Sequence, residues 1–189
     1  DVGANVGAYA LLFGLWVGAS GRVLAFEPAP EAFAGLRRHL ALNRLDRRVR
    51  AVQTAVSDRE GEASFVSEGF QGTNHLSVPN RPAGAALIRV PTTTIDAVCV
   101  EYQLHPRLIK IDVEGAEVEV LRGARQTIAA MDRGAGIFVE MHPAAWRTVG
   151  QSADAMRTEL AAQGLRAVPL RQTSDPWAVD GECMRLERQ

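Results

Sequence analysis

The residues best suited to chemistry stand at the start of the chain. The heptapeptide Asp-Val-Gly-Ala-Asn-Val-Gly occupies positions 1–7, and the apolar stretch 23–26 ends at Glu27. Gly3 lets the backbone turn sharply and approach a ligand, and Gly7 lets the next helix pack tightly on a sheet. An acid at a strand end about 20 residues later is typical of a group that accepts hydrogen bonds from a ribose. The pattern predicts a nucleoside-binding half-fold, against the plainer interpretation of a tight turn followed by a solvated acid.

A second group of ionisable residues follows two later apolar segments. Asp112 and Glu114 come after one of them, and Glu140 and His142 come after the other. Ligands of open α/β sheets bind at the carboxyl ends of the strands, so these four side chains are candidates for catalysis there. His142 is the first candidate for a general base, because imidazole titrates near neutral pH. Asp112, Glu140 and His142 could also bind Mg²⁺, which would lower the pKa of an acceptor hydroxyl.

These residues also have purely structural interpretations. His142 precedes a proline and could serve only to bond a loop carbonyl, and Glu140 could cap a neighbouring loop. Glu114 and Glu117 fall near the start of a predicted helix, where the helix dipole favours negative charge. The sequence leaves both interpretations open.

The elements that position these residues alternate between strand and helix. The predicted strands are 23–26, 49–56, 62–66, 86–90, 108–111 and 137–139, followed by an antiparallel pair at 165–171 and 182–186. The predicted helices run from the opening turn to about Val17, over 31–42, within 94–104, from 112–117 through 128, and over 152–163. This alternation indicates a mostly parallel sheet with crossover helices on both faces. The Gly-, Asn- and Pro-rich stretch within 67–91 predicts a disordered loop or a lid.

The opening turn discriminates between cofactors. A dinucleotide-binding turn reads Gly-x-Gly-x-x-Gly because the chain passes beneath a pyrophosphate. Here Asn5 replaces the glycine that would admit phosphate, and the expected third glycine is missing. S-adenosylmethionine carries no phosphate, but it has a ribose for Glu27 and an amino-acid end whose ammonium could pair with Asp1. The turn therefore favours S-adenosylmethionine over a nicotinamide dinucleotide.

Six blocks of sequence, in order, resemble those of the FkbM-type methyltransferases, a branch of the Rossmann-like methyltransferases. The blocks are residues 1–7, 25–28, 55–58, 90–96, 109–117 and 140–142. The resemblance implies a class I methyltransferase fold, which is α/β, within a single domain spanning residues 1–189. The family pattern has an apolar strand already running before its first Asp, so we expect a truncated first strand and an N-terminally incomplete domain.

The resemblance also implies roles for individual residues. Asp1, Gly3, Asn5 and Gly7 would form the loop at the methionine side of S-adenosylmethionine, and Glu27 would hold the ribose. The end of the third strand would border the adenine through Ala55, Val56 and Ser57. Asp112 would meet both the amino-acid end of the cofactor and the methyl acceptor.

These features predict an S-adenosylmethionine-dependent methyltransferase. Methyl transfer is an in-line displacement, so alignment supplies much of the catalysis, and a base helps when the acceptor is a hydroxyl. The Asn/Asp-Pro-Pro-Tyr signature of DNA amino-methylases is absent, and Ile-Asp-Val-Glu stands in its place. We therefore expect O-methylation, and the resemblance implies a sugar or other small molecule as acceptor. The alternatives are a nicotinamide-dependent oxidoreductase and a methyltransferase-like module without catalytic activity.

The composition describes an ordinary globular chain. Of the 189 residues 47% are apolar, and the formal net charge of −1 offers no bulk electrostatic reason for binding nucleic acid or a membrane. The arginines between positions 37 and 50 fit the solvated face of a helix and its exit loop better than a nucleic-acid surface. The apolar segment after the opening turn is shorter than the about 20 residues that cross a bilayer.

Two further compositional features bear on location and coding. Cys99 and Cys183 lie far apart without Cys-x-x-Cys spacing, and no targeting segment is visible, so we expect a reducing, cytoplasmic location. The chain has twenty arginines and a single lysine, Lys110. This bias indicates a GC-rich coding sequence rather than a function.

Overall fold

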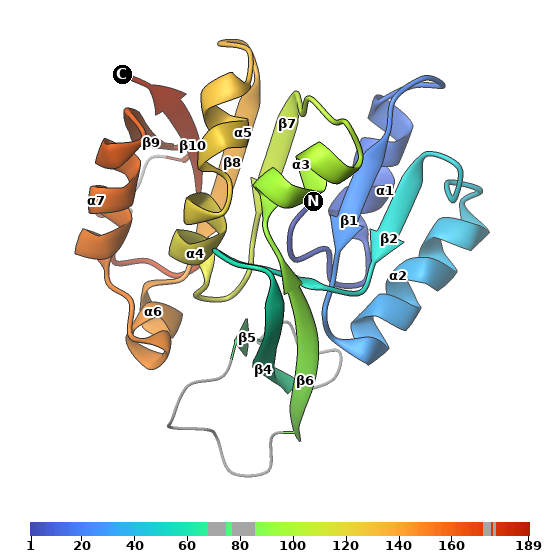
Figure 1. Cartoon of the computed structure of the whole chain (residues 1–189), viewed down its shortest axis with the longest axis horizontal. Coiled ribbons are helices and arrows are strands. Elements are labelled where there is room, and N and C mark those ends of the chain that lie inside the picture. The colour runs from blue at the N-terminus through green and yellow to red at the C-terminus, as the bar shows by residue number, and fades with distance from the viewer. Residues whose placement is uncertain (68–74, 77–85, 172–174, 176) are drawn as a thin grey trace.

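The computed structural model describes residues 1–67, 75–76, 86–171, 175 and 177–189. Most of the predicted loop or lid within 67–91 therefore lies outside the described residues. In the described part, the chain forms a main sheet with helices on both faces and a smaller sheet beside it (Figure 1).

The main sheet has the mostly parallel arrangement that the sequence predicts. Its strands are β1 (Val23–Phe26), β2 (Val49–Val52), β7 (Leu108–Ile111), β8 (Gly136–Met141), β9 (Leu165–Pro169) and β10 (Glu182–Arg188). The spatial order is β2, β1, the segment at Val2, β7, β8, β10, β9. β10 runs antiparallel to both of its neighbours, so the predicted C-terminal antiparallel pair is confirmed.

Val2 occupies the central position of this sheet. Its backbone N–H donates to the carbonyl of Lys110 at 2.9 Å, and its carbonyl accepts from the N–H of Asp112 at 3.0 Å. On its other side, Val2 forms a parallel bridge to Phe26. The turn that follows therefore emerges between the ends of β1 and β7, at the point where the strand order reverses direction.

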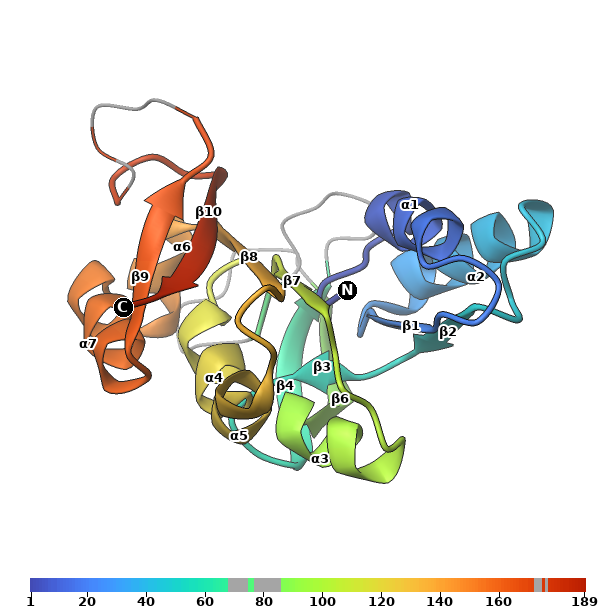
Figure 2. The same cartoon turned by 90° about the horizontal axis from the view of Figure 1, so that it is seen from above.

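Helices cover both faces of the main sheet (Figure 2). α1 (Ala8–Trp16) and α2 (Pro30–Leu42) pack over β1 and β2 on one face. The other face is covered by α3 (Ile95–Glu101), α4 (Glu117–Arg122), α5 (Arg125–Ala130) and α7 (Ala153–Ala162), and α6 (Pro143–Val149) follows β8. The larger core lies on this second face and includes Ile111, Val139 and Trp146, each at most 1% exposed.

The smaller sheet corrects one sequence prediction. It is formed by β3 (Ala55–Val56), β6 (Ala86–Thr93), β4 (Gly61–Ser67) and β5 (His75–Leu76), in that spatial order. The sequence predicts one strand over 49–56, but the chain leaves the main sheet after Val52 and pairs again at Ala55 with β6. A continuous apolar run does not reveal such a change of partner, because each half satisfies the strand pattern.

The helices differ from the sequence prediction in two places. The predicted helix beyond 117 is divided into α4 and α5 at Gly123, where a Cβ atom would lie 2.1 Å from the carbonyl oxygen of Ser57. The short helix α6 was not predicted, although Pro143 at its start and Gly150 at its end are the usual helix boundary residues. Among the described residues, no helix combines the length and apolar character needed to cross a bilayer.

Candidate active site

A cleft opens at the carboxyl edge of the main sheet, beside the smaller sheet. Of the residues singled out from the sequence, eight line it: Gly3, Asn5, Glu27, Ala55, Val56, Asp112, Glu114 and Glu140. Asp1, Gly7, Ser57 and His142 are not among the lining residues. The topology thus brings the ends of β1, β3, β7 and β8 to one place.

The glycines of the opening turn are required by neighbouring chain segments. Gly3 has a φ of +76°, and a Cβ atom there would lie 1.7 Å from the carbonyl oxygen of Asp112. Gly7 has a φ of +99° and packs against Leu36 of α2, at 2.7 Å from a would-be Cβ to the Leu36 Cδ1. The close approach predicted between Gly3 and a ligand is therefore first an approach to β7, and Gly7 accommodates the neighbouring helix.

Glu27 holds the turn in place from the end of β1. It is 5% exposed, and its two carboxylate oxygens accept hydrogen bonds from the backbone N–H groups of Asn5 and Ala29, both at 2.8 Å. Burial raises the pKa of Glu27, although these two hydrogen bonds oppose the shift. Each oxygen retains a second lone pair for a ligand hydroxyl.

Two buried polar groups beside the turn lack hydrogen-bond partners among the described residues. They are the amide oxygen of Asn5 and the carboxylate of Asp1. Asn5 has a φ of +48° and lines the cleft, and its amide oxygen is buried without a donor among the described residues. The Asp1 side chain is fully buried, with Lys110 Nζ 3.6 Å from its Oδ1. A buried acceptor without a hydrogen-bond donor costs free energy of folding, so both groups are candidates for contact with a bound ligand.

One wall of the cleft is mostly apolar. Ala55 and Val56 of β3 and Phe65 of β4 line it, and Thr54 adds a hydroxyl. Ser57 stands one residue beyond, where its backbone N–H donates to the carbonyl of Thr93 at 2.8 Å. Ser57 therefore joins β3 to β6 and does not line the cleft itself. An apolar wall of this kind suits the face of a base ring.

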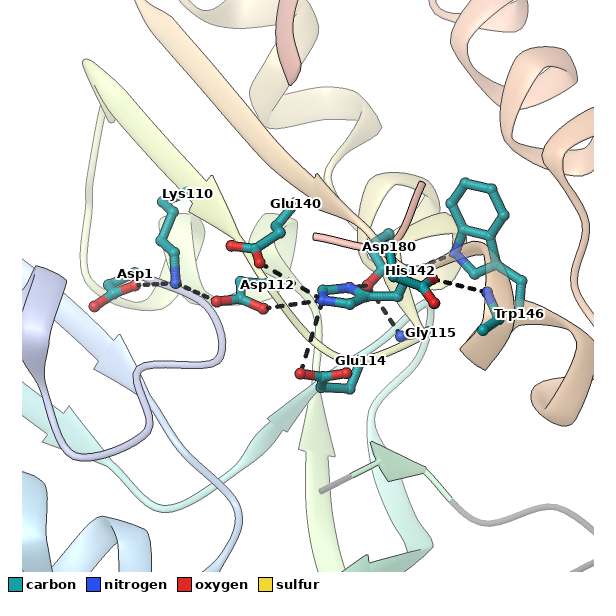
Figure 3. A network of polar contacts seen from close by, with 11 residues as sticks. Asp1, Lys110, Asp112, Glu114, Gly115, Glu140, His142, Trp146 and Asp180 are labelled. Carbon is teal, nitrogen blue, oxygen red and sulfur yellow. Dashed lines mark hydrogen bonds and ion pairs between the residues drawn. The ribbon is translucent and has the colours of Figure 1, made fainter. Parts of the chain in front are cut away.

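The predicted catalytic acids lie around the ring of His142 (Figure 3). Its Nε2 lies 3.8 Å from Asp112 Oδ1, 3.7 Å from Glu114 Oε1 and 3.8 Å from Glu140 Oε1. The four residues come from the ends of β7 and β8 and from the loop before α4, where Glu114 adopts a φ of +52°. The predicted catalytic cluster is thus formed in space.

Glu117, which the sequence assigned to the helix dipole, anchors this cluster from behind. Its side chain has no exposed surface, and its Oε1 lies 2.8 Å from His142 Nδ1. Trp146 Nε1 donates to the other oxygen at 2.6 Å, and the Gly115 N–H donates to Oε1 at 3.0 Å. A carboxylate that contacts one nitrogen of an imidazole fixes the orientation of the ring. The contact with Nδ1 therefore leaves Nε2 of His142 to face the other acids.

The electrostatic consequences for the cluster are large. Burial by itself lowers the pKa of His142, but the hydrogen bond and charge of Glu117, with Glu114 and Asp112, outweigh it and raise the pKa to about 9. Burial raises the pKa of Glu114 to about 7, with Asp112 and the other carboxylates adding to the shift against His142. His142 is therefore an imidazolium at neutral pH, and Glu114 titrates there.

These charges bear on the predicted Mg²⁺ site. Asp112, Glu140 and His142 each offer one ligand atom, and the three atoms lie within 4.8 Å of one another. However, the ammonium of Lys110 lies 2.9 Å from Asp112 Oδ2, and a metal would have to displace the proton from His142 Nε2. The residues fit a protonated imidazole among carboxylates better than they fit a divalent cation.

Comparison with solved structures identifies the class of the fold. An FkbM methyltransferase from Methylobacillus flagellatus matches with a TM-score of 0.61 at 20% identity, over 98% of this chain and 42% of that one. An O-methyltransferase from Bacillus cereus in complex with SAH matches with a TM-score of 0.53 at 12% identity, over 99% and 72% of the two chains. The fold is that of the Rossmann-like class I methyltransferases, as predicted.

Sequence comparisons narrow this class. The 2-O-methyltransferase NoeI of Sinorhizobium fredii is 32% identical over an alignment of 143 positions, and the match covers 68% of this chain and 57% of NoeI. The hexuronic acid methyltransferase AglP of Haloferax volcanii is 27% identical over 145 residues, 75% of this chain and 54% of AglP. The family model of the methyltransferase FkbM domain matches residues 1–167. The chain belongs to the FkbM methyltransferase family, and it spans little more than half the length of these two curated relatives.

Proposed function

We propose that this chain is an S-adenosylmethionine-dependent methyltransferase domain that methylates a hydroxyl of a small molecule or glycan. The observation that carries the proposal is that one cleft is lined both by the buried Glu27 and by Asn5, whose amide oxygen has no hydrogen-bond partner among the described residues. The cleft lies where the strand order reverses, the usual ligand position in open α/β sheets. Membership of the FkbM family supports the same activity.

The lining residues suit the three parts of the donor. Glu27 would accept hydrogen bonds from the ribose hydroxyls through its free lone pairs. Asn5 would accept one from the ammonium at the amino-acid end, near Asp112, and the wall of Ala55 and Val56 would cover the adenine. When bound, S-adenosylmethionine supplies an electrophilic methyl group on a positively charged sulfur. Asp1, Gly7 and Ser57 would act indirectly, by supporting the turn and β3.

The acid cluster suits an acceptor that must lose a proton. His142 is already protonated at neutral pH, so it is poorly placed to act as the base that the sequence suggested. Glu114 lines the cleft and has a pKa of about 7, close to the value that favours a general base. We assign proton acceptance to Glu114, and we assign to His142 the role of holding Asp112, Glu114 and Glu140 together.

The same cluster bears on the kind of acceptor. Three carboxylates at this end of the cleft, among the described residues, would repel a phosphate backbone, which favours a small molecule or glycan over nucleic acid. The name of NoeI specifies a 2-O-methyltransferase, which supports an oxygen acceptor, and the name of AglP specifies hexuronic acid, which supports a sugar. With two free cysteines, the chain suits the cytoplasm, where we propose it acts.

Calorimetry with S-adenosylhomocysteine on the full chain tests the proposal. We expect binding by the wild type and at least about tenfold weaker binding by Glu27→Gln, since a hydrogen bond to a charged group contributes about 1.5–3 kcal/mol. Glu62→Gln, at an exposed carboxylate on β4, is the matched control and should bind as the wild type does. Absence of binding by the wild type would refute the proposed cofactor. If the wild type binds, a labelled-methyl screen of sugars and metabolites identifies the methyl acceptor.

A further inference from the structure

Lys110 is the only lysine among the 21 basic residues of the chain. From the sequence alone, we interpret the excess of arginine over lysine as a result of a GC-rich coding sequence. In the structure, however, Lys110 lies in β7 with only 9% of its side chain exposed, whereas the arginines of the salt bridges are 39% to 84% exposed. The single lysine of the chain is thus buried next to the candidate active site.

The ammonium of Lys110 joins three parts of the fold. Its Nζ lies 2.9 Å from Asp112 Oδ2 at the end of β7 and 3.6 Å from Asp1 Oδ1 in the central segment. It also lies 4.6 Å from the centre of the Tyr9 ring on α1. Because Asp1 is fully buried and makes no hydrogen bond through its carboxylate, Lys110 is the charge that compensates it among the described residues.

The geometry also gives Asp112 a defined orientation. One carboxylate oxygen, Oδ2, is held by Lys110, and the other, Oδ1, points toward His142 Nε2 at 3.8 Å (Figure 3). Asp112 lines the cleft, whereas Lys110 does not. Any effect of Lys110 on a bound ligand is therefore indirect, and Asp112 is the lining residue that its ammonium contacts directly.

The site requires a compact cation. An ammonium is a point charge with three rotatable donors, while a guanidinium is a planar fork that needs a matching flat partner. Between two carboxylates on adjacent strands and an aromatic ring, a small group can reach all three partners. A guanidinium, which is larger and planar, is less suited to contact all three of them.

We propose that Lys110 is a positioning residue of the methyltransferase site, which holds the Asp112 carboxylate in the orientation that receives the amino-acid end of the donor. Together, Asp1, Lys110 and Asp112 form a negative–positive–negative array with a net charge of −1, which complements the cationic amino group of the donor. This inference rests on the proposed function, because it assumes that the donor binds beside Asp112.

Calorimetric binding of S-adenosylhomocysteine to the full chain provides the test. We expect Lys110→Met to raise the dissociation constant at least about tenfold, and Lys110→Arg not to restore it. We also expect Lys110→Met to add less than about twofold when Asp112 is already changed to Asn, because the effect acts through Asp112. Arg166→Met removes an exposed ion pair with Glu187 and is the control, with wild-type affinity expected. Circular dichroism establishes that each variant is folded.

The outcomes separate this inference from the proposed function. If the wild type does not bind, the proposed function fails and the role of Lys110 fails with it. If the wild type binds, an affinity of folded Lys110→Met within twofold of it overturns the role of Lys110 alone, as do additive effects of Lys110→Met and Asp112→Asn. Should Lys110→Met not fold, the same comparisons are made with Asp1→Asn added, which removes the uncompensated buried charge.

Discussion

At the scale of single residues, the most informative side chain is that of Glu117. It is fully buried, yet its carboxylate receives three hydrogen-bond contacts, from His142, Trp146 and the N–H of Gly115. A buried charge is tolerated only when it is paired and hydrogen-bonded in this way. Glu117 thus determines both the orientation and the charge of His142, and through it the arrangement of the acids in the cleft.

Replacing Glu117 with Gln tests this role. We expect the pKa of His142 to fall from about 9 toward its ordinary value of 6.5, because the substitution removes the negative charge nearest to the ring. NMR titration of the His142 ring nitrogens measures the change. His105, which precedes β7 and so lies at the opposite end of that strand from Asp112, provides the internal reference. An unchanged titration of His142 would show that the other carboxylates are sufficient.

At the scale of elements, the turn between the central segment and α1 determines where the cleft forms. The turn is held by the hydrogen bonds from the N–H groups of Gly3 to Phe26 and of Asn5 to Glu27, and by that of the preceding Val2 to Lys110 of β7. β1, β7 and the turn therefore form one connected unit, and an added side chain at Gly3 would separate its parts.

A pair of glycine substitutions separates strain from crowding in this turn. Gly18 has a φ of +72° with nothing within 4 Å of its would-be Cβ, whereas Gly3 has a similar φ and a carbonyl oxygen at 1.7 Å. We expect Gly18→Ala to lower the free energy of unfolding by about 1–2 kcal/mol through backbone strain alone. Gly3→Ala should cost clearly more, because β7 must also shift. Urea unfolding measures both, and equal costs would contradict the crowding argument.

At the scale of the whole molecule, the cluster links stability to pH. The folded pKa of His142 is raised, so its contribution to stability is complete below about pH 6.5 and is lost as the pH rises through about 9. Glu114, whose pKa is raised to about 7, acts in the same direction at lower pH, since the folded state again binds protons more tightly. The site therefore destabilises the fold as the solution becomes alkaline.

Urea unfolding at pH 6 and at pH 9.5 measures this linkage. We expect the free energy of unfolding of the wild type to decrease across this interval by up to about 3 kcal/mol from His142, at about 1.4 kcal/mol for each unit of pKa shift. In Glu117→Gln the decrease should be much smaller, because the His142 pKa is then near its ordinary value. Parallel pH profiles for the two proteins would contradict the assignment of the raised pKa to Glu117.

Much of the fold was predictable from local sequence patterns. The strands at Val23–Phe26 and Leu108–Ile111, and the helix at Pro30–Leu42, follow directly from apolar runs and from a proline at a helix start. The division of the predicted strand at 49–56 was not predictable. Which sheet a strand joins depends on its distant partners, here β1 for Val49–Val52 and β6 for Ala55–Val56.

The candidate site divides in the same way. The sequence by itself determined the chemical groups and their strand ends, because Glu27, Asp112, Glu140 and His142 each follow an apolar run that must be buried. Only the tertiary structure decided the partners: it buried Glu117 behind His142 and Lys110 between Asp1 and Asp112. The physical reason is that a local pattern reports whether a segment is buried, whereas the charge state of a buried group depends on neighbours that only the packing of separate strands and helices brings within a few ångströms.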